Sequence, residues 1–208
     1  MRLLVFTAHP DDEIACLGMI EKAKKEGEVL LICFTSQNET RIKEFNSACE
    51  FLEIKGINLG LEDGMLTITG AIRKKLIDMI KEFKPDVVMC HSDEDYHPDH
   101  KKVNAIARDV VEFSRQNAKP EWELKEFMIW DSTNLFTNPH FTLGFEEDVM
   151  DKKKKLWDIH SSQTSNDRDK KYYLNFLEYK SRLRGAQIRE KYGESYKKIP
   201  LVINGDFY

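Results

Sequence analysis

Two short segments of the chain gather most of the side chains that can bind a metal ion or transfer a proton. Residues 8–13 read AHPDDE and residues 91–100 read HSDEDYHPDH, so four of the six histidines fall in these two runs, together with seven carboxylates. Neutral imidazole and carboxylate suit a divalent cation such as Zn²⁺, which in catalytic sites keeps three protein ligands and an open position. The two segments therefore predict a metal site at which hydrolysis can occur.

Spacing within the two segments predicts which side chains face the same point. His9 and Asp12 are three residues apart, and so are the two histidines of the HPDH run, a spacing that brings both side chains to one side of a helical turn. His9 and Asp12 need one more ligand, which the second segment supplies. The spacing leaves open whether it is His97 or His100. Asp11 has a different side-chain direction and is suited to be the general base that takes a proton from water.

The hydrophobic pattern predicts the elements that position these segments. Continuous apolar runs typical of buried strands alternate with segments whose apolar residues have helical spacing. The expected strands cover 3–6, 29–34, 57–61, 87–90 and 124–130, and the expected helices cover 12–26, 39–54, 70–83, 98–117, 146–158 and 167–191, with irregular structure over 132–145. Buried strands connected by helices indicate an α/β protein with a Rossmann-like, doubly wound, mostly parallel sheet and helices on both faces.

The predicted sheet brings the two polar segments together. In such a sheet, ligands bind beyond the carboxyl ends of the strands, where the strand order reverses. The strands at 3–6 and 87–90 are expected to be neighbours, and a polar segment follows each of them, so both segments should border one cleft. A dinucleotide site is disfavoured there, because three consecutive acids replace the glycine-rich turn that binds phosphate.

The overall composition limits the classes of function. Of the 208 residues, 41% are hydrophobic, enough for a buried core, and the net charge of −4 argues against a dedicated nucleic-acid binder. The apolar runs are far too short to span a membrane. The four cysteines form no CxxC pair, which predicts reduced, mostly buried thiols and a cytoplasmic protein. We expect one domain over residues 1–208, with a core at 1–131 and a helical or irregular part at 132–208.

Several other polar and aromatic side chains are interpreted as structural. His91 is expected to be a packed, hydrogen-bonded core histidine, and His140 a surface residue. The lysine run at 152–155 is expected to form a solvated helix face. The aromatic run at 172–179 has the helical spacing typical of core residues.

The two polar segments together resemble the signature of the LmbE/PIG-L-like de-N-acetylases. AHPDDE after the first strand and HPDH after a later one are jointly highly specific for this family, and weaker resemblances extend along almost the whole chain. These are R-x-x-E-x-x-x-A at 41–48, L-G-x-x-D-G at 59–64, H-x-S-Q at 160–163, Arg-Gly at 184–185 and YGESY at 192–196. The resemblance therefore covers both the expected core and the C-terminal part.

The resemblance implies a zinc-dependent hydrolase that removes the acetyl group from an N-acetylglucosamine-type sugar or sugar conjugate. Zn²⁺ or another divalent transition metal would be the cofactor, and a small amino sugar the partner. By motif position, His9, Asp12 and His100 would bind the metal. The remaining implied roles are Asp11 as general base, His97 as oxyanion stabiliser or proton donor, Asp99 as the residue that orients His97, and Arg41 and Asp63 as substrate contacts.

Some features leave the substrate open. The glycine-rich stretch that commonly follows the first motif in the family reads ACLGM at 15–19, and its bulkier side chains change how closely a sugar can approach. Arg41 has an alternative role in a surface ion pair with Glu44. The alternative functions are an amidase acting on a thiol-sugar conjugate or another amide, and a non-catalytic metal- or sugar-binding module. Asp11 favours hydrolysis, because binding a cation needs no base. The sequence allows a homo-oligomer without deciding it.

Overall fold

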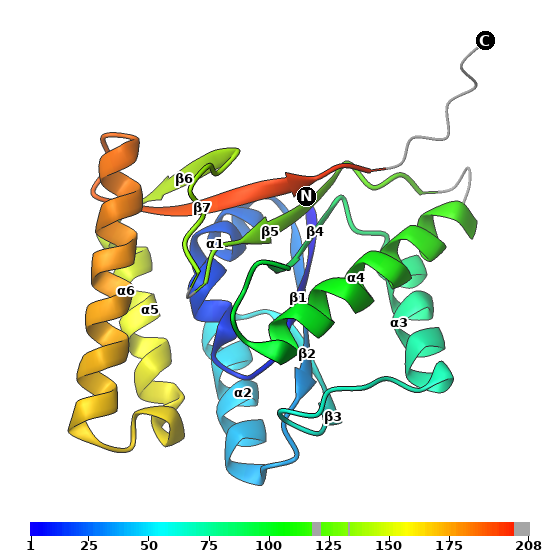
Figure 1. Ribbon diagram of the computed structural model, residues 1–208, viewed down its shortest axis with the longest axis horizontal. Helices are drawn as coiled ribbons and strands as arrows, with labels where there is room; N and C mark the ends of the chain where they lie inside the picture. Colours follow the sequence, from blue (N-terminus) through cyan, green and yellow to red (C-terminus); the bar gives the residue numbers. More distant parts are fainter. Residues whose placement is uncertain (118–121, 133, 202–208) are drawn as a thin grey trace.

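The computed structural model describes residues 1–117, 122–132 and 134–201, which form a seven-stranded sheet with helices on both faces (Figure 1). The sheet has the order β3-β2-β1-β4-β5-β7-β6, and its first five strands are parallel. The strands are β1 (Arg2–Thr7), β2 (Glu28–Thr35), β3 (Lys55–Leu61), β4 (Val87–His91), β5 (Glu126–Trp130), β6 (Phe141–Phe145) and β7 (Tyr192–Ile199). This order confirms the predicted doubly wound α/β fold, with β1 and β4 adjacent at its centre.

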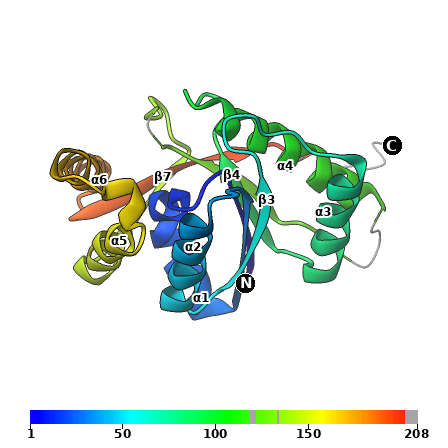
Figure 2. The same cartoon turned by 90° about the horizontal axis from the view of Figure 1, so that it is seen from below.

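The helices divide between the two faces of the sheet because both faces are apolar. Leu3 and Val5 of β1 belong to one buried cluster, whereas Leu4 and Phe6 belong to the other, as the alternation of side chains along a strand requires. The pair α3 and α4 covers one face, while α1, α2 and α5 pack on the opposite side (Figure 2). The helices are α1 (Leu17–Glu26), α2 (Glu39–Leu52), α3 (Gly70–Phe83), α4 (Pro98–Asn117), α5 (Glu147–Ile159) and α6 (Asp167–Gln187), with 3₁₀-helices η1 (Asp12–Cys16) and η2 (Ser161–Thr164).

The helix expected over 12–26 is interrupted, which corrects the prediction. Residues 12–16 form the 3₁₀-helix η1, and α1 begins only at Leu17. The Glu194 side chain of β7 accepts hydrogen bonds from the backbone N–H groups of Gly18 (2.9 Å) and Met19 (3.4 Å), so it satisfies the free amides at the start of α1. A Cβ at position 18 would lie 2.9 Å from a Glu194 oxygen, which explains the glycine there.

Two strands were missed in the C-terminal part. The segment 132–145, expected to be irregular, contains β6, and the helix expected to reach residue 191 ends at Gln187, before β7. β7 pairs antiparallel with both β5 and β6. Its sequence, YGESYKKI, carries charged residues that hide a strand pattern, yet Glu194 and Ser195 are buried. The sheet is therefore parallel in its N-terminal strands and antiparallel at one edge.

The expectation of buried thiols is met. All four cysteines are free and buried. Among the helices that the structure describes, none is long and apolar enough to cross a membrane.

Candidate active site

The polar ends of β1 and β4 lie side by side and open into one cavity of about 390 Å³. The cavity lies at the carboxyl edge of the parallel strands, where ligands bind in this class of sheet. Seven of the eight predicted site residues line it: His9, Asp11, Asp12, Arg41, Asp63, His97 and His100. The eighth, Asp99, is completely buried next to them. The structure therefore brings together residues that come from four separate segments of the chain.

The histidines and carboxylates form groups of donor atoms compact enough for a metal ion. Donor atoms of His9, His97 and His100 lie within 4.8 Å of one another, and the same holds for Asp12, His91 and His100. The rings of His97 and His100 stack, with centroids 4.7 Å apart. Imidazole and carboxylate donors at this density fit a borderline divalent cation.

Asp12 is the carboxylate that ties these histidines together. Its Oδ2 atom accepts a hydrogen bond from the backbone N–H of His9 (2.6 Å), and its Oδ1 atom lies 3.3 Å from His100 Nε2. Burial alone would raise the pKa of Asp12, but the charge of His100 and the hydrogen bonds that Asp12 receives hold it well below its usual range. Asp12 is therefore an anion suited to bind a cation.

His91 and His100 lie in contact, and their pKa values are shifted in opposite directions. Their rings stack with centroids 3.8 Å apart. Burial and the charge of His100 lower the pKa of His91 to about 4, whereas the carboxylates of Asp12 and Asp95 outweigh burial and raise the pKa of His100 to about 10. His91 Nε2 accepts a hydrogen bond from the backbone N–H of Ala8, so His91 is the packed, hydrogen-bonded histidine that the sequence predicts.

Asp11 precedes η1 in a conformation that an L-residue rarely adopts. Its φ angle is 106°, in the left-handed region. The backbone N–H of Asp11 donates to Glu13 Oε2 (3.0 Å), and Arg41 Nη2 lies 3.4 Å from Asp11 Oδ2. Burial and the neighbouring charge of Asp12 raise the pKa of Asp11 to about 7. A carboxylate with a pKa near neutrality is suited to accept and return a proton.

Glu13 and His160 form a buried ion pair that the sequence did not reveal as part of the site. His160 Nε2 lies 2.6 Å from Glu13 Oε1, and both side chains are completely buried. Through its other oxygen, Glu13 holds the backbone of Asp11. The H-x-S-Q motif marks residues 160–163 in the sequence. Nothing in the sequence, however, indicates that His160 contacts Glu13.

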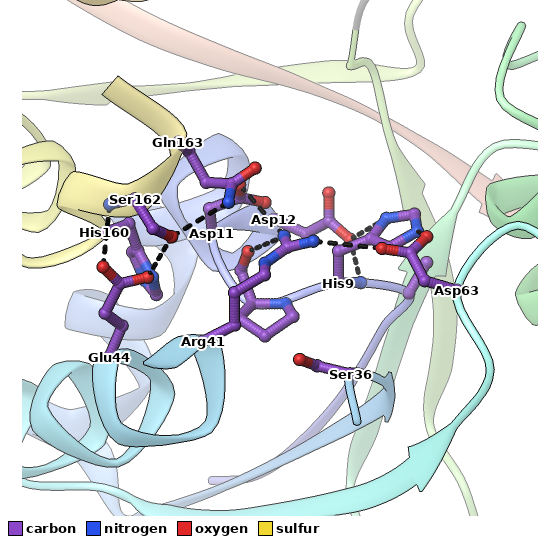
Figure 3. Close-up of polar contacts among 12 residues, drawn as sticks. His9, Asp11, Asp12, Ser36, Arg41, Glu44, Asp63, His160, Ser162 and Gln163 are labelled. Atoms are coloured by element: carbon purple, nitrogen blue, oxygen red, sulfur yellow. Dashed lines mark hydrogen bonds and ion pairs between the residues drawn. The ribbon is translucent and has the colours of Figure 1, made fainter. Parts of the chain in front are cut away.

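The η2 helix that follows His160 is anchored to α2. Glu44 accepts hydrogen bonds from the backbone N–H of Ser162 (2.8 Å) and from its hydroxyl (2.6 Å) (Figure 3). Glu44 therefore does not pair with Arg41, and the surface ion pair considered between them is absent from the contacts of this region. Instead, the two residues lie one turn apart on α2 and contact different segments: Arg41 lines the cavity, and Glu44 holds η2.

His97 and Asp99 contact each other through the main chain. The backbone N–H of Asp99 donates to His97 Nδ1 (3.2 Å), whereas the Asp99 carboxylate accepts from the N–H of Gly64 (2.7 Å) and lies 3.3 Å from His9 Nε2. Because Nδ1 accepts this bond, neutral His97 carries its proton on Nε2. Burial lowers the pKa of His97, and the charges of His9 and His100 lower it further. His97 is thus a neutral donor.

Arg41 and Asp63 meet at the mouth of the cavity. Arg41 Nη1 lies 3.1 Å from Asp63 Oδ2, and its Nη2 donates to the carbonyl of Pro10 (2.8 Å), so the guanidinium lies between Asp11 and Asp63 (Figure 3). The Asn38 side chain accepts from the backbone N–H of Arg41 (3.3 Å) and caps the helix that carries it. Asp63 is half-exposed, so its oxygens remain accessible to a ligand.

The C-terminal part also lines the cavity, which corrects two interpretations. Lys153, expected on a solvated face, is 1% exposed, and its Nζ atom lies 2.5 Å from Glu194 Oε1. Tyr172, Tyr173 and Phe176, expected in the core, lie in the cavity wall, and Tyr172 is 59% exposed. The helical spacing of these residues is the same for either location, so periodicity could not distinguish them. By contrast, His140 is on the surface as expected.

Solved structures with the same fold include enzymes of different classes. N,N′-diacetylchitobiose deacetylase from Pyrococcus horikoshii has a TM-score of 0.81 and 24% identity, over 96% of this chain and 84% of that one. The conserved protein TT1542 from Thermus thermophilus has a TM-score of 0.79 and 23% identity, over 99% and 98%. The 4-carboxy-2-hydroxymuconate hydratase GalB from Pseudomonas putida also has a TM-score of 0.79, with 16% identity, over 100% and 99%. These likenesses establish the fold, and since a hydratase shares it, the reaction has to be argued from the site.

The family is established by the sequence from β1 to α4, which we call the parallel half of the molecule. The model of the GlcNAc-PI de-N-acetylase (PIG-L) family matches residues 4–111, a span that begins in β1 and ends in α4. This span contains both polar segments and all eight predicted site residues. The chain therefore belongs to the PIG-L family of de-N-acetylases.

Proposed function

We propose that this protein hydrolyses the acetamide of an N-acetylglucosamine-type sugar or sugar conjugate to acetate and a free amine. The observation that carries the proposal is the position of Asp11, a carboxylate with a pKa near 7 that lines the same cavity as a compact group of histidine and aspartate donors. A binding module needs the donors alone. A general base beside them is what hydrolysis requires.

The proposed cofactor is Zn²⁺, held by His9, Asp12 and His100. These residues fit it, because His9 Nδ1 lies 3.6 Å and His100 Nε2 lies 3.3 Å from the Asp12 carboxylate, and two imidazoles and one carboxylate are a usual set for catalytic zinc. When bound, such an ion supplies Lewis-acid polarisation of the amide carbonyl and lowers the pKa of water. Other divalent transition metals accept the same donors, and His91 offers a further nitrogen donor beside His100.

The residues of the chain then have distinct roles in the proposed reaction. Asp11 accepts a proton from water while the water oxygen bonds to the amide carbonyl carbon. His97 donates its Nε2–H to the oxygen that becomes negatively charged. As the carbon–nitrogen bond breaks, Asp11 returns its proton to the amine nitrogen, and the acetyl group leaves as acetic acid, which ionises to acetate. Asp99 holds His9 with its carboxylate and His97 with its backbone N–H.

Arg41 and Asp63 are the proposed contacts to the substrate. Both lie at the mouth of the cavity, and the planar guanidinium of Arg41 offers several donors to sugar hydroxyls. Asp63 offers acceptor oxygens on a half-exposed side chain. The pair can therefore orient a sugar while the acetamide reaches the histidines.

Domain organisation and location are part of the proposal. We take residues 1–208 as one deacetylase domain, although residues 202–208 lie outside the described part of the chain. The free, buried cysteines support a reducing compartment, the cytoplasm.

A substrate panel tests the proposal. The purified protein, stripped of metal by a chelator, is incubated with N-acetylated amino sugars and thiol-sugar conjugates with and without added Zn²⁺, and acetate is measured. Acetate release that depends on zinc supports the function, and hydrolysis of the thiol-sugar conjugates alone supports the alternative amidase. Binding of these compounds without acetate release under any condition would return the protein to the class of binding modules.

Metal content in His100→Ala tests the ligand assignment separately. Loss of one of three ligands should reduce the zinc bound per chain, and activity should fall with it. Full zinc content in His100→Ala together with loss in His97→Ala would reverse the roles of the two histidines.

A further inference from the structure

Asp63 lies between the candidate metal ligand His9 and the guanidinium of Arg41 (Figure 3). Its Oδ1 atom lies 3.0 Å from His9 Nε2, and its Oδ2 atom lies 3.1 Å from Arg41 Nη1. Because each carboxylate oxygen has two lone pairs, these contacts leave room for the substrate contact proposed above. Asp63 therefore has a partner within the protein on each oxygen, in addition to any substrate.

The two ring nitrogens of His9 face different carboxylates. Nδ1 lies 3.6 Å from Asp12 Oδ2, on the side of the donors proposed to hold zinc. Nε2 lies 3.0 Å from Asp63 Oδ1 and 3.3 Å from Asp99 Oδ2. A neutral imidazole carries a single proton, and the two acceptors at Nε2 favour the tautomer with the proton on that nitrogen. The lone pair of the ring is then on Nδ1 and faces Asp12.

The turn that carries Asp63 is fixed by the completely buried Asp99. The Asp99 carboxylate accepts hydrogen bonds from the backbone N–H groups of Gly64 (2.7 Å) and Leu66 (3.4 Å). Gly64 has a φ angle of 77°, a left-handed conformation that glycine adopts without strain, and the Leu66 side chain is 1% exposed. The position of Asp63 beside His9 is therefore set by the fold itself.

A carboxylate on the outer nitrogen of a metal-binding histidine has a known physical effect. It fixes the tautomer and the orientation of the ring and makes the other nitrogen a stronger donor, and its loss typically costs 10- to 100-fold in metal affinity or activity. The ion pair between Asp63 and Arg41 also reaches the proposed base, because Arg41 Nη2 lies 3.4 Å from Asp11 Oδ2. Asp63 thus connects the metal-binding histidine to the proton acceptor.

We propose that Asp63 is a positioning residue, which holds the His9 proton on Nε2 so that Nδ1 is the nitrogen offered to the metal ion. The inference rests on the proposed function, in which His9 binds zinc. It gives Asp63 a role that is separate from its contact to the substrate. A substrate contact affects KM, whereas a positioning residue affects zinc affinity when no substrate is present.

Zinc titration without substrate tests this role. The chelator-treated protein competes for Zn²⁺ with a chromophoric chelator, and Asp63→Asn should raise the Kd for zinc about 10- to 100-fold. Asp63→Glu keeps a carboxylate on a half-exposed side chain and should recover part of the affinity. Glu62→Gln is the matched control, because Glu62 is the exposed neighbouring acid, and it should bind zinc as the wild type does. Equal Tm values of the zinc-free variants show that the loss of affinity is not a loss of folding.

The tautomer gives a second readout. Long-range proton–nitrogen NMR of the zinc-loaded wild type should show the His9 proton on Nε2, and a proton on Nδ1 overturns the inference. It is also overturned if Asp63→Asn and Glu62→Gln bind zinc equally well, in which case a raised KM in Asp63→Asn leaves only the substrate contact. If the wild type binds no zinc, the inference fails with the cofactor assignment, whereas acetate release from the substrate panel would still sustain the proposed hydrolysis.

Discussion

The parallel half of the molecule, from β1 to α4, and the C-terminal part, from α5 to β7, contribute to the cavity in different ways. The parallel half supplies the groups that can react, and they fall in two short runs of the sequence, one at 9–12 and one at 97–100. The C-terminal part supplies groups that hold them or line the same cavity, such as His160, Lys153 and the rings of α6. Its contacts to the parallel half join residues more than a hundred positions apart. The reactive groups thus come from two short runs that adjacent strands bring together, whereas residues that position them lie in the C-terminal part of the chain.

The largest expected effect is in the parallel half, at the proposed base. Asp11→Asn keeps the size of the side chain but removes the proton acceptor. The value of kcat should fall about 10²- to 10⁴-fold with little change in KM. Metal content, measured by elemental analysis, should stay near that of the wild type. Wild-type activity in this variant would exclude Asp11 as the base, and parallel loss of metal would make it a ligand.

Loss of Lys153, a buried residue of the C-terminal part, should lower the stability of the protein. Lys153→Met leaves the Glu194 carboxylate buried without its cation, and the free energy of unfolding should fall by about 3–5 kcal/mol. Urea titration measures this change. Lys155→Met is the matched control, because Lys155 is exposed on the same helix and its replacement should change stability by less than about 0.5 kcal/mol. An equal loss of stability in the Lys153→Met and Lys155→Met variants would show that the buried pair with Glu194 does not stabilise the fold.

His160→Gln tests positioning across the two regions. The amide loses the ion pair to Glu13 that holds the backbone of Asp11, so kcat should fall roughly 10- to 100-fold, as for other residues that orient a metal site. Zinc content should be retained. The surface variant His140→Gln should behave as the wild type. Unchanged kcat in His160→Gln would confine the pair to a structural role.

Arg41→Ala tests substrate selection within the parallel half. Loss of a charge-assisted hydrogen bond of about 1.5–3 kcal/mol should raise KM about tenfold or more on the best panel substrate. Steady-state kinetics and metal analysis should show kcat and zinc content close to those of the wild type. A KM equal to that of the wild type would assign Arg41 to the ion pair with Asp63 alone.

The smallest effect is expected from a carboxylate outside the site. Asp86 accepts a hydrogen bond from the backbone N–H of Arg2 (2.7 Å) and lies 3.1 Å from Lys125 Nζ, and these contacts lower its pKa. Its stabilisation, about 1 kcal/mol, is therefore complete above the ordinary carboxyl value of 3.8 and is lost as the pH falls below it. Asp86→Asn should be less stable than the wild type near pH 7, with the difference vanishing in acid. Thermal denaturation across this pH range, with unchanged activity, checks it.

Sequence patterns predicted the parallel half well because its signals are local. The bounds of α3 and α4 were predicted at 70–83 and 98–117, where apolar residues recur at helical spacing. Continuous apolar runs marked β1, β2 and β4, and the adjacency of β1 and β4 followed from the general rules of doubly wound sheets. The convergence of the two polar segments followed in turn, because each directly succeeds one of two adjacent strands.

Other features could be decided only by the tertiary structure, because they depend on contacts between distant segments. Glu194 splits the expected helix at 12–26 and, with Lys153, forms a buried pair whose members look like surface residues in the sequence. The spacing of Tyr172 and Phe176 is the same in a core or a cavity wall, so only the packing of α6 assigns them. The sequence by itself thus determined the fold class and the reactive residue types. The tertiary structure decided which of the distant residues orient them, because side-chain burial and ion pairing arise only when the chain is folded.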